Sequence, residues 1–485
     1  MSDLELCYTG ARKLARMIRT RKVSATEVMR AFISRIEAVN PKVNAIVTFL
    51  PEQALKRAKA LDRKGSEGGA LAGLPIAHKD IVPTKGIRTT FGSPIYRDHV
   101  PAEDHIIVER LRSAGAILLG KTNTPEFAVG AQTFNPIFGA TRNPYDLSKT
   151  SGGSSGGAAA AVASGMLPFA DGSDLGSSLR NPGSFCNVVG FRPTPGRVPN
   201  WPFPNTWDTL WSIGPIARTV EDAALLFSAM AGPDPRVPTS HAEAGSGFAR
   251  PLARSFRKVR VAWTSDLGGA FPVDARVTRA LEPALAVLQS LGCIVEEAAP
   301  DLAGADEAFQ VQRALGFVEA YGDLLETQRA LMKDTVVWNI EQGLVLDAAR
   351  IANANVLRSR VFHTMRSFLE RYEFLVLPAV QVPPFPVDQP YVTEIDGVKL
   401  GNYMEWMKSC YLITATSHPA ISVPAGFTED GLPVGLQIVG RYRDDFGVLQ
   451  LAHAFEGATE VWKRRPMLIV TPAKAGAQFG ENHER

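Results

Sequence analysis

Apolar and polar positions follow two different patterns along this chain, one with helical periodicity and one of short apolar runs. Behind the capping box at residues 24–27, apolar residues recur every three or four positions, which predicts an amphipathic helix. Short apolar runs bounded by turn residues predict buried strands. Strands are expected at residues 74–82, 116–119, 166–170, 188–191, 259–263, 293–297, 375–378, 420–423 and 436–439. Helices are expected at residues 24–36, 52–63, 106–114, 158–163, 219–230, 273–291, across most of 304–374, and at 446–455.

These strands and helices alternate, and that order is typical of an α/β fold. Residues 259–297 are expected to form a strand-helix-strand unit. The last two strands are separated by residues 429–431, Glu-Asp-Gly, a turn that predicts a β-hairpin. At 485 residues, the chain is long enough for one large domain or for two to three smaller ones.

Residues 151–180 hold most of the hydroxyls and glycines that an acyl-transfer site needs. The glycine-rich loop 152–157 gives up stability for backbone freedom, which suits main-chain N–H groups that approach a ligand closely. An alanine-rich helix and the strand at 166–170 follow, and residues 172–178 are expected to form a second polar loop. One helix and one strand between two serine loops can bring those loops side by side.

Lys79 lies between His78 and Asp80 in the strand expected at 74–82. Most lysines in proteins are solvated surface charges. Here the apolar residues before Lys79 predict a strand that enters the core, so the ammonium group is expected to be partly buried. A buried ammonium either pairs with another group or loses its proton.

The composition is that of an ordinary soluble globular protein. The 52 basic and 49 acidic residues leave a net charge of +3, and no basic block carries interleaved aromatic residues, so no nucleic-acid partner is expected. Four separated cysteines without a C-x-x-C pair argue against a disulfide framework and a zinc site. Without a signal-peptide pattern or a bilayer-spanning run, a cytoplasmic protein with no metal, cofactor or membrane partner is expected. Residues 473–485 are expected to form a disordered tail.

Residues 115–122 match the phosphate-binding pattern G-x-x-x-x-G-K-[ST] letter by letter. The variable positions are Ala-Ile-Leu-Leu, which predict a strand rather than a loop. N–H groups within a strand are used by the β-ladder and are not free to bind phosphate. The match is therefore not expected to mark a nucleotide site.

Residues 152–156 fit the G-x-S-x-G nucleophile elbow. An elbow follows a buried strand, whereas the residues before this loop are polar. It also needs a later histidine, and each available one is better explained as a core or surface residue. These histidines are His363, His418, His453 and His483.

A third arrangement uses lysine as the base. Lys79, Ser154 and Ser178 can form a relay in which a neutral lysine takes the proton of one serine while that serine takes the proton of the other. Burial lowers the pKa of a lysine, which makes the neutral form plausible. The spacing of the three residues does not by itself establish the relay.

Several long motifs, in order, resemble the amidase signature family of Ser-cisSer-Lys amide hydrolases. They occupy residues 73–80, 120–127, 152–157, 172–182, 185–194, 418–426 and 431–437. The resemblance covers residues 10–465 and is weakest at 236–371. It implies a large mixed β-sheet covered by helices on both faces. It also implies a single domain at 1–472, with a variable, substrate-shaping region at about 236–371.

Carried over position by position, the resemblance implies Ser178 as the nucleophile, Ser154 as a bridging serine after a cis peptide bond, and Lys79 as the general base. The oxyanion would be held by four backbone N–H groups, those of Leu175, Gly176, Ser177 and Ser178. No metal or cofactor is implied.

This chain departs from the family pattern at Ser177, where the family usually has glycine. Ser177 places a side chain in the oxyanion loop and competes with Ser178 for the role of nucleophile. We keep Ser178 because its spacing from Ser154 matches the family. The extra side chain is expected to narrow the pocket, distort the oxyanion hole or lower the activity.

The expected reaction is hydrolysis of a small-molecule amide to an acid and an amine or ammonia. Aromatic residues in the middle of the chain favour an aryl or hydrophobic amide, although core packing explains any one of them as well. The candidate linings are Trp207, Trp211, Phe317 and Trp338. Two alternatives stay open, namely the glutaminase subunit of a tRNA-dependent amidotransferase and an inactive amidase-like protein that only binds amides. A homodimer stays open as the oligomeric state.

Overall fold

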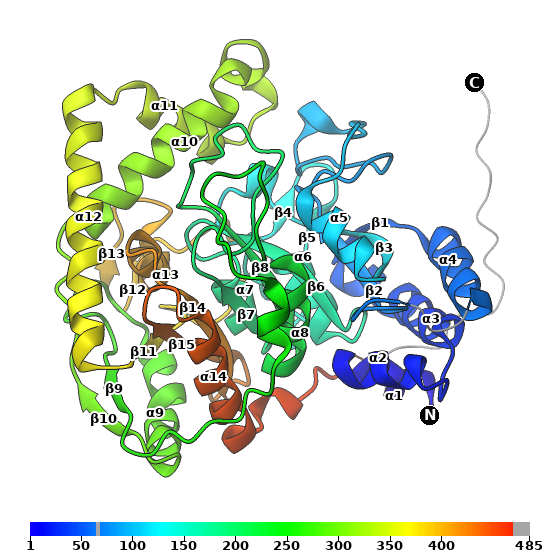
Figure 1. Cartoon of the computed structure of the whole chain (residues 1–485). Helices are drawn as coiled ribbons and strands as arrows, with labels where there is room; N and C mark the ends of the chain where they lie inside the picture. The colour runs from blue at the N-terminus through cyan, green and yellow to red at the C-terminus, as the bar shows by residue number, and fades with distance from the viewer. Residues whose placement is uncertain (65–67, 469–485) are drawn as a thin grey trace.

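The computed structural model describes residues 1–64 and 68–468, so the tail expected at 473–485 lies outside the described residues. Strands and helices alternate along most of this length (Figure 1). The strands are β1 (Ile46–Phe49), β2 (Pro75–Lys79), β3 (Ile117–Thr122), β4 (Phe134–Asn135), β5 (Gly139–Ala140), β6 (Phe169–Asp174), β7 (Val189–Arg192), β8 (Ser212–Ala217), β9 (Arg260–Trp263), β10 (Ile294–Glu297), β11 (Phe374–Pro378), β12 (Glu394–Ile395), β13 (Val398–Lys399), β14 (Ala420–Phe427) and β15 (Pro433–Gly440).

The helices range from single short turns to two long helices near the middle of the chain. They are α1 (Asp3–Tyr8), α2 (Ala11–Arg19), α3 (Ala25–Val43), α4 (Pro51–Lys64), α5 (Ile106–Ser113), α6 (Gly156–Ala163), α7 (Arg180–Phe185), α8 (Val220–Met230), α9 (Ala275–Ser290), α10 (Ala305–Gln328), α11 (Asp334–Leu344), α12 (Ala348–Arg371), α13 (Lys408–Ala415) and α14 (Asp445–Thr459). Within the described part of the chain, no helix combines the length and the apolar character needed to cross a membrane.

An eight-stranded mixed sheet forms the centre of the molecule, in the order β10-β9-β11-β15-β14-β7-β8-β6 (Figure 1). The strands β10, β9 and β11 are parallel, and every other neighbouring pair is antiparallel. A separate sheet in the order β1-β3-β2 carries the segment that contains Lys79. The expected α/β class with a large mixed sheet is confirmed.

Successive residues of the central strands face two different hydrophobic clusters. In β11, Phe374 and Val376 belong to one cluster, while Leu375 and Leu377 belong to the other. This alternation is the period of two that a strand imposes on its side chains. Helices α8, α9 and α14 supply residues to the first cluster and α10 to α13 to the second, so helices cover both faces of the sheet.

The strand-helix-strand unit and the final hairpin are confirmed. β9, α9 and β10 occupy residues 260–297, and β9 and β10 pair in parallel. β14 and β15 pair in antiparallel fashion around the expected turn, where Gly431 has a φ of 81°. A positive φ of this size is the conformation that glycine adopts without a steric penalty.

The prediction for residues 166–178 was wrong in part. The strand expected at 166–170 begins at Phe169 and runs on to Asp174, through residues that were expected to lie in a polar loop. Their polar side chains find partners inside the core, so polarity does not expel them from the strand. The neighbouring strand β8 was not predicted at all; it lies between β7 and β6.

Candidate active site

Lys79 ends β2, and its side chain is fully buried. Its Nζ donates hydrogen bonds to three serine hydroxyls, at 2.6 Å to Ser154, 3.1 Å to Ser155 and 3.0 Å to Ser173. Ser154 and Ser155 come from the glycine-rich loop, and Ser173 comes from β6. The structure therefore brings the sequence-predicted Lys79 and Ser154 into direct contact.

Burial, and not nearby charge, makes the neutral form of Lys79 accessible. Burial lowers the pKa of the Lys79 ammonium to about 7, and the carboxylates of Asp171 and Asp174 oppose this shift. Asp171 holds the backbone of Lys79: its Oδ2 accepts the Lys79 N–H at 3.1 Å, and its Oδ1 lies 2.6 Å from Nδ1 of His78. Near neutral pH, a large share of Lys79 can therefore accept a proton.

The glycine-rich loop that carries Ser154 is buried rather than mobile on the surface. The Gly153–Ser154 peptide bond is cis, and Gly152 has a φ of 74°. A Cβ atom on Gly153 would lie 2.8 Å from the backbone nitrogen of Gln132. At these two positions the glycines allow close packing against other parts of the protein.

Ser178 lies in the loop between β6 and α7, in the wall of a narrow cavity of about 30 Å³. Ser154 and Ser173 line the same cavity. The backbone N–H of Ser155 donates to the carbonyl of Ser178 at 3.3 Å, which joins the two serine loops. The three predicted catalytic residues are thus brought together, because Lys79 contacts Ser154 and Ser154 shares the cavity with Ser178.

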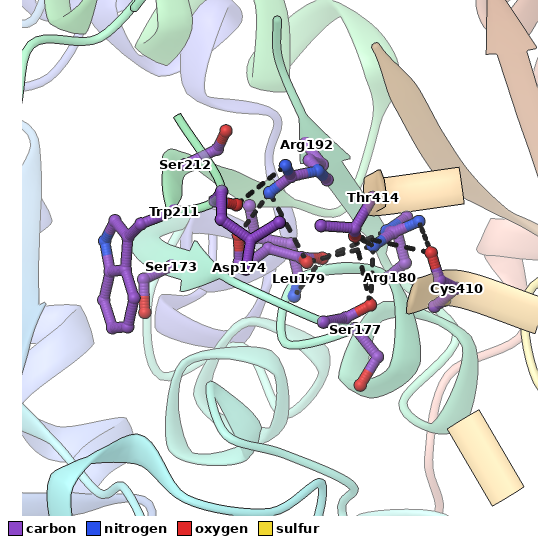
Figure 2. Close-up of polar contacts among 12 residues, drawn as sticks. Ser173, Asp174, Ser177, Leu179, Arg180, Arg192, Trp211, Ser212, Cys410 and Thr414 are labelled. Carbon is purple, nitrogen blue, oxygen red and sulfur yellow. Dashed lines mark hydrogen bonds and ion pairs between the residues drawn. The ribbon is translucent and has the colours of Figure 1, made fainter. Parts of the chain in front are cut away.

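A buried ion cluster holds the loop that carries Ser178 (Figure 2). Arg180 donates to both carboxylate oxygens of Asp174, from Nε and Nη2, each at 3.0 Å. Nη2 also donates to the carbonyl of Gly176 at 2.8 Å, and the N–H of Leu179 donates to Asp174 at 3.1 Å. Because the Gly176 carbonyl accepts a hydrogen bond from Arg180, the loop is tied to the ion cluster.

Arg192 and residues from distant helices complete this cluster. Arg192 donates to the backbone carbonyl of Asp174 and, at 2.9 Å, to that of Leu210. Arg180 reaches the hydroxyl of Thr414 at 2.8 Å and the carbonyl of Cys410 at 2.9 Å (Figure 2). Sequence reasoning missed this cluster. The only signal was that Arg180 and Arg192 are the sole charged residues of the stretch 175–192.

Ser177, the departure from the family pattern, is buried in the wall of the same cavity. Its hydroxyl donates to Sδ of Met407 at 3.2 Å. The hydroxyls that Lys79 contacts are those of Ser154, Ser155 and Ser173. Ser177 therefore narrows the cavity together with Met407 but is not joined to the lysine.

An outer cavity of about 190 Å³ adjoins the narrow one and shares wall residues with it. Three of the four aromatic residues expected to shape the pocket, Trp207, Trp211 and Phe317, line it. Trp338 does not: it packs edge-on against Tyr403, with 5.6 Å between ring centroids. Trp338 lies on α11, where one face of the helix packs on the second hydrophobic cluster.

Lys121 shows that residues 115–122 do not form a phosphate loop. Residues 117–122 are β3, as the apolar pattern predicted. Nζ of the buried Lys121 donates to the carbonyl of Val82 at 2.5 Å and to the hydroxyls of Thr84 and Thr89 at 3.0 and 3.1 Å. The lysine that would bind phosphate thus donates its hydrogen bonds to protein groups inside the core.

The nucleophile elbow is also absent from the described structure. No strand leads directly into Ser154, whose hydroxyl bonds to Lys79. His418 is buried with Nδ1 2.8 Å from the carbonyl of Thr416, and burial lowers its pKa to about 4. His363 packs edge-on against Phe362. His453 lies within α14, and His483 lies outside the described residues.

Comparisons with known proteins identify the family of this chain. The Amidase family model matches residues 27–449. An acylamidase from Rhodococcus erythropolis is 36% identical, over 96% of this chain and 98% of its own length. A glutamyl-tRNA(Gln) amidotransferase subunit from Carboxydothermus hydrogenoformans is also 36% identical, over 96% of this chain and all of its own. The crystal structure of a bacterial aryl acylamidase of the amidase signature family superimposes with a TM-score of 0.88 at 30% identity, over 94% of this chain and 98% of the other. The chain therefore belongs to the amidase signature family and is an amide-hydrolysing enzyme.

Proposed function

We propose that this amidase hydrolyses a small-molecule amide with an aryl or hydrophobic group, with Ser178 as nucleophile and Ser154 and Lys79 as its proton relay. The observation that carries the proposal is the 2.6 Å contact between Lys79 Nζ and Oγ of Ser154, a residue that lines the same cavity as Ser178. A lysine with a pKa near 7 is suited to accept a proton at neutral pH.

In the proposed mechanism, the Ser178 hydroxyl attacks the amide carbonyl while its proton passes to Ser154 and the Ser154 proton passes to neutral Lys79. Backbone N–H groups of residues 175–178 hold the oxyanion, and each such donor is typically worth about 3 to 4 kcal/mol. The proton then returns through Ser154 to the leaving nitrogen, and the C–N bond breaks. Water hydrolyses the Ser178 ester by the reverse path.

The outer cavity supports the choice of an aryl or hydrophobic substrate. Its wall includes Phe127, Trp211 and Phe317, which the narrow cavity shares. Aromatic walls of this kind bury apolar ligand surface, while a few polar groups orient the ligand. The names of the Rhodococcus erythropolis acylamidase and the bacterial aryl acylamidase point in the same direction.

Covalent labelling tests the nucleophile. The protein is treated with a fluorophosphonate, and its intact mass and peptide map are compared for the wild type, Ser178→Ala and the neighbouring control Ser177→Ala. We expect one adduct, on Ser178, that is lost only in Ser178→Ala. An adduct on Ser177 or Ser154 would contradict the assignment, and complete absence of labelling would favour the amide-binding alternative.

A second candidate is the glutaminase subunit of a tRNA-dependent amidotransferase, because the amidotransferase chain from Carboxydothermus hydrogenoformans is equally similar. The two functions differ in their substrate and in their need for partners. The purified single chain is assayed for aniline release from acetanilide and for ammonia release from glutamine. Turnover of acetanilide by the chain alone favours the first function, and glutamine turnover without anilide turnover favours the second.

A further inference from the structure

Arg313, on α10, lies in the wall of both the narrow cavity and the outer cavity. Its side chain is only 7% exposed. Nε donates to the side-chain oxygen of Asn339 at 3.0 Å, and Nη2 donates to the hydroxyl of Tyr403 at 3.0 Å. The guanidinium carbon lies 4.8 Å from the ring centroid of Phe317. All these protein partners are electrically neutral.

The positive charge of Arg313 has no carboxylate within 4.0 Å in the described part of the chain, and its Nη1 donates no hydrogen bond there. Buried Arg218 also lacks such a carboxylate in the described part of the chain, but its guanidinium donates to three backbone carbonyls, those of Thr9, Val162 and Leu167. Two further buried arginines have a carboxylate partner. Arg180 pairs with Asp174 at 3.0 Å, and Arg197 pairs with Asp445 at 2.9 Å. A buried ion without a counter-ion is costly unless something else compensates it.

We propose that the substrate amide carries a carboxylate and that Arg313 binds it. The inference rests on the proposed amide hydrolysis and narrows its substrate class. A guanidinium matches a carboxylate geometrically and can bind both oxygens, and burial strengthens the pairing. Because Arg313 belongs to the walls of both cavities, the carboxylate lies close to the scissile amide while the apolar part of the substrate fills the outer cavity.

Three anilides that differ in charge test the proposal. Acetanilide is neutral, 4-acetamidobenzoate carries the carboxylate on the amine side, and succinanilic acid carries it on the acyl side. We expect wild-type kcat/KM for one of the two acids to exceed that for acetanilide by about 10- to 100-fold, the typical effect of a charge-assisted hydrogen bond. The favoured acid identifies the side of the amide that faces Arg313.

The substitution Arg313→Gln should abolish this advantage, measured within the variant as the ratio of kcat/KM for the favoured acid to kcat/KM for acetanilide. Arg313→Lys keeps the charge but loses the planar pair of N–H donors, and should retain part of the preference for the acid. The matched control is Arg350→Gln, which removes an exposed guanidinium that pairs with Glu307 of α10 and lines neither cavity. It should keep the full preference. Equal kcat/KM for all three anilides, or a preference that survives in Arg313→Gln, overturns the proposal.

Direct binding separates this inference from the proposed catalysis. Calorimetry measures the binding of the two acids and of acetanilide to Ser178→Ala and to the double variant Ser178→Ala/Arg313→Gln. Tighter binding of one acid, lost in the double variant, supports a carboxylate site even where no anilide is turned over. Turnover of acetanilide combined with no preferential acid binding overturns the carboxylate site and leaves the amide hydrolysis standing.

Discussion

Two buried lysines on adjacent strands have nearly the same environment and different partners. Lys79 on β2 and Lys121 on β3 lie on paired strands, with His78 opposite Lys121 and Lys79 opposite Thr122. Both side chains are fully buried. Burial lowers the pKa of Lys79 to about 7 and that of Lys121 to about 8, and nearby carboxylates oppose both shifts.

The difference lies in what each ammonium contacts. Lys121 bonds to the carbonyl of Val82 and to two threonine hydroxyls of the loop after β2, so it holds that loop in place. Lys79 bonds to hydroxyls of which two, those of Ser154 and Ser173, line the narrow cavity. A lowered lysine pKa therefore does not identify a base by itself. A base also needs a route for its proton to a cavity that admits a substrate.

The largest expected effect is that of Lys79→Met. It should lower kcat by at least about 10³-fold while changing substrate binding little, because the relay loses its proton acceptor. Steady-state kinetics, together with calorimetric binding of a slowly hydrolysed amide, measures the two quantities. Lys121→Met is the matched control. An active Lys79→Met enzyme would eliminate the relay.

The pH dependence of kcat/KM should depend on Lys79 and not on Lys121. Lys79 is a base only when neutral, so kcat/KM should fall as pH drops through about 7, the pKa of Lys79, by roughly tenfold for each further pH unit. Activity at pH 5 should therefore be about 100-fold below its plateau. The profile is measured on a neutral anilide for the wild type and for Lys121→Met, which should retain the same midpoint. A flat profile between pH 5 and 8 would contradict Lys79 as the base.

For Lys121→Met, the main expected effect is on stability rather than on chemistry. The carbonyl of Val82 and the hydroxyls of Thr84 and Thr89 lose a donor, which should lower the free energy of unfolding by about 1 to 3 kcal/mol. Urea denaturation of wild type and variant measures the difference. A variant with native stability but little activity would reverse the roles assigned to the two lysines.

The smallest expected effect is that of Ser177→Gly. Ser177 places a hydroxyl in the cavity wall that bonds to Met407 instead of joining the contacts of Lys79. Its removal should widen the cavity and raise kcat/KM for bulky anilides by up to about threefold, without moving the fluorophosphonate label from Ser178. A drop in activity comparable to that of Lys79→Met would show that Lys79 activates Ser177 rather than Ser178.

The role of Lys79 can be predicted from the sequence better than the contacts of Lys121. The strand before Lys79 is apolar, and the motifs around Lys79, Ser154 and Ser178 resemble those of a known family, so their chemistry could be anticipated. For Lys121 the apolar pattern correctly predicted a strand. Its threonine partners lie in a loop more than 30 positions earlier, and no local pattern indicates that contact.

The other contacts that the sequence did not predict have the same physical origin, because most of them join elements that are far apart in the chain. Residues 172–174 look like a loop because they are polar, yet Ser173 and Asp174 are satisfied by Lys79 and Arg180 within the core. Met407 lies 230 positions from Ser177. The partners of Arg313 come from α11 and from the segment before α13. Periodicity reports which face of an element is buried, whereas these contacts depend on which elements meet.

The place of the β14–β15 hairpin in the sheet bears on how the protein is synthesised. The hairpin lies between β11 and β7, so a nascent chain that has not yet reached residue 440 has two unpaired sheet edges, both open to association with other chains. The side chain of Gln437, on β15, also accepts a hydrogen bond from Arg180 beside the Ser178 loop. During synthesis, Arg180 is therefore made 257 residues before Gln437, so the contact that holds the start of α7 against β15 forms only after the hairpin has been made.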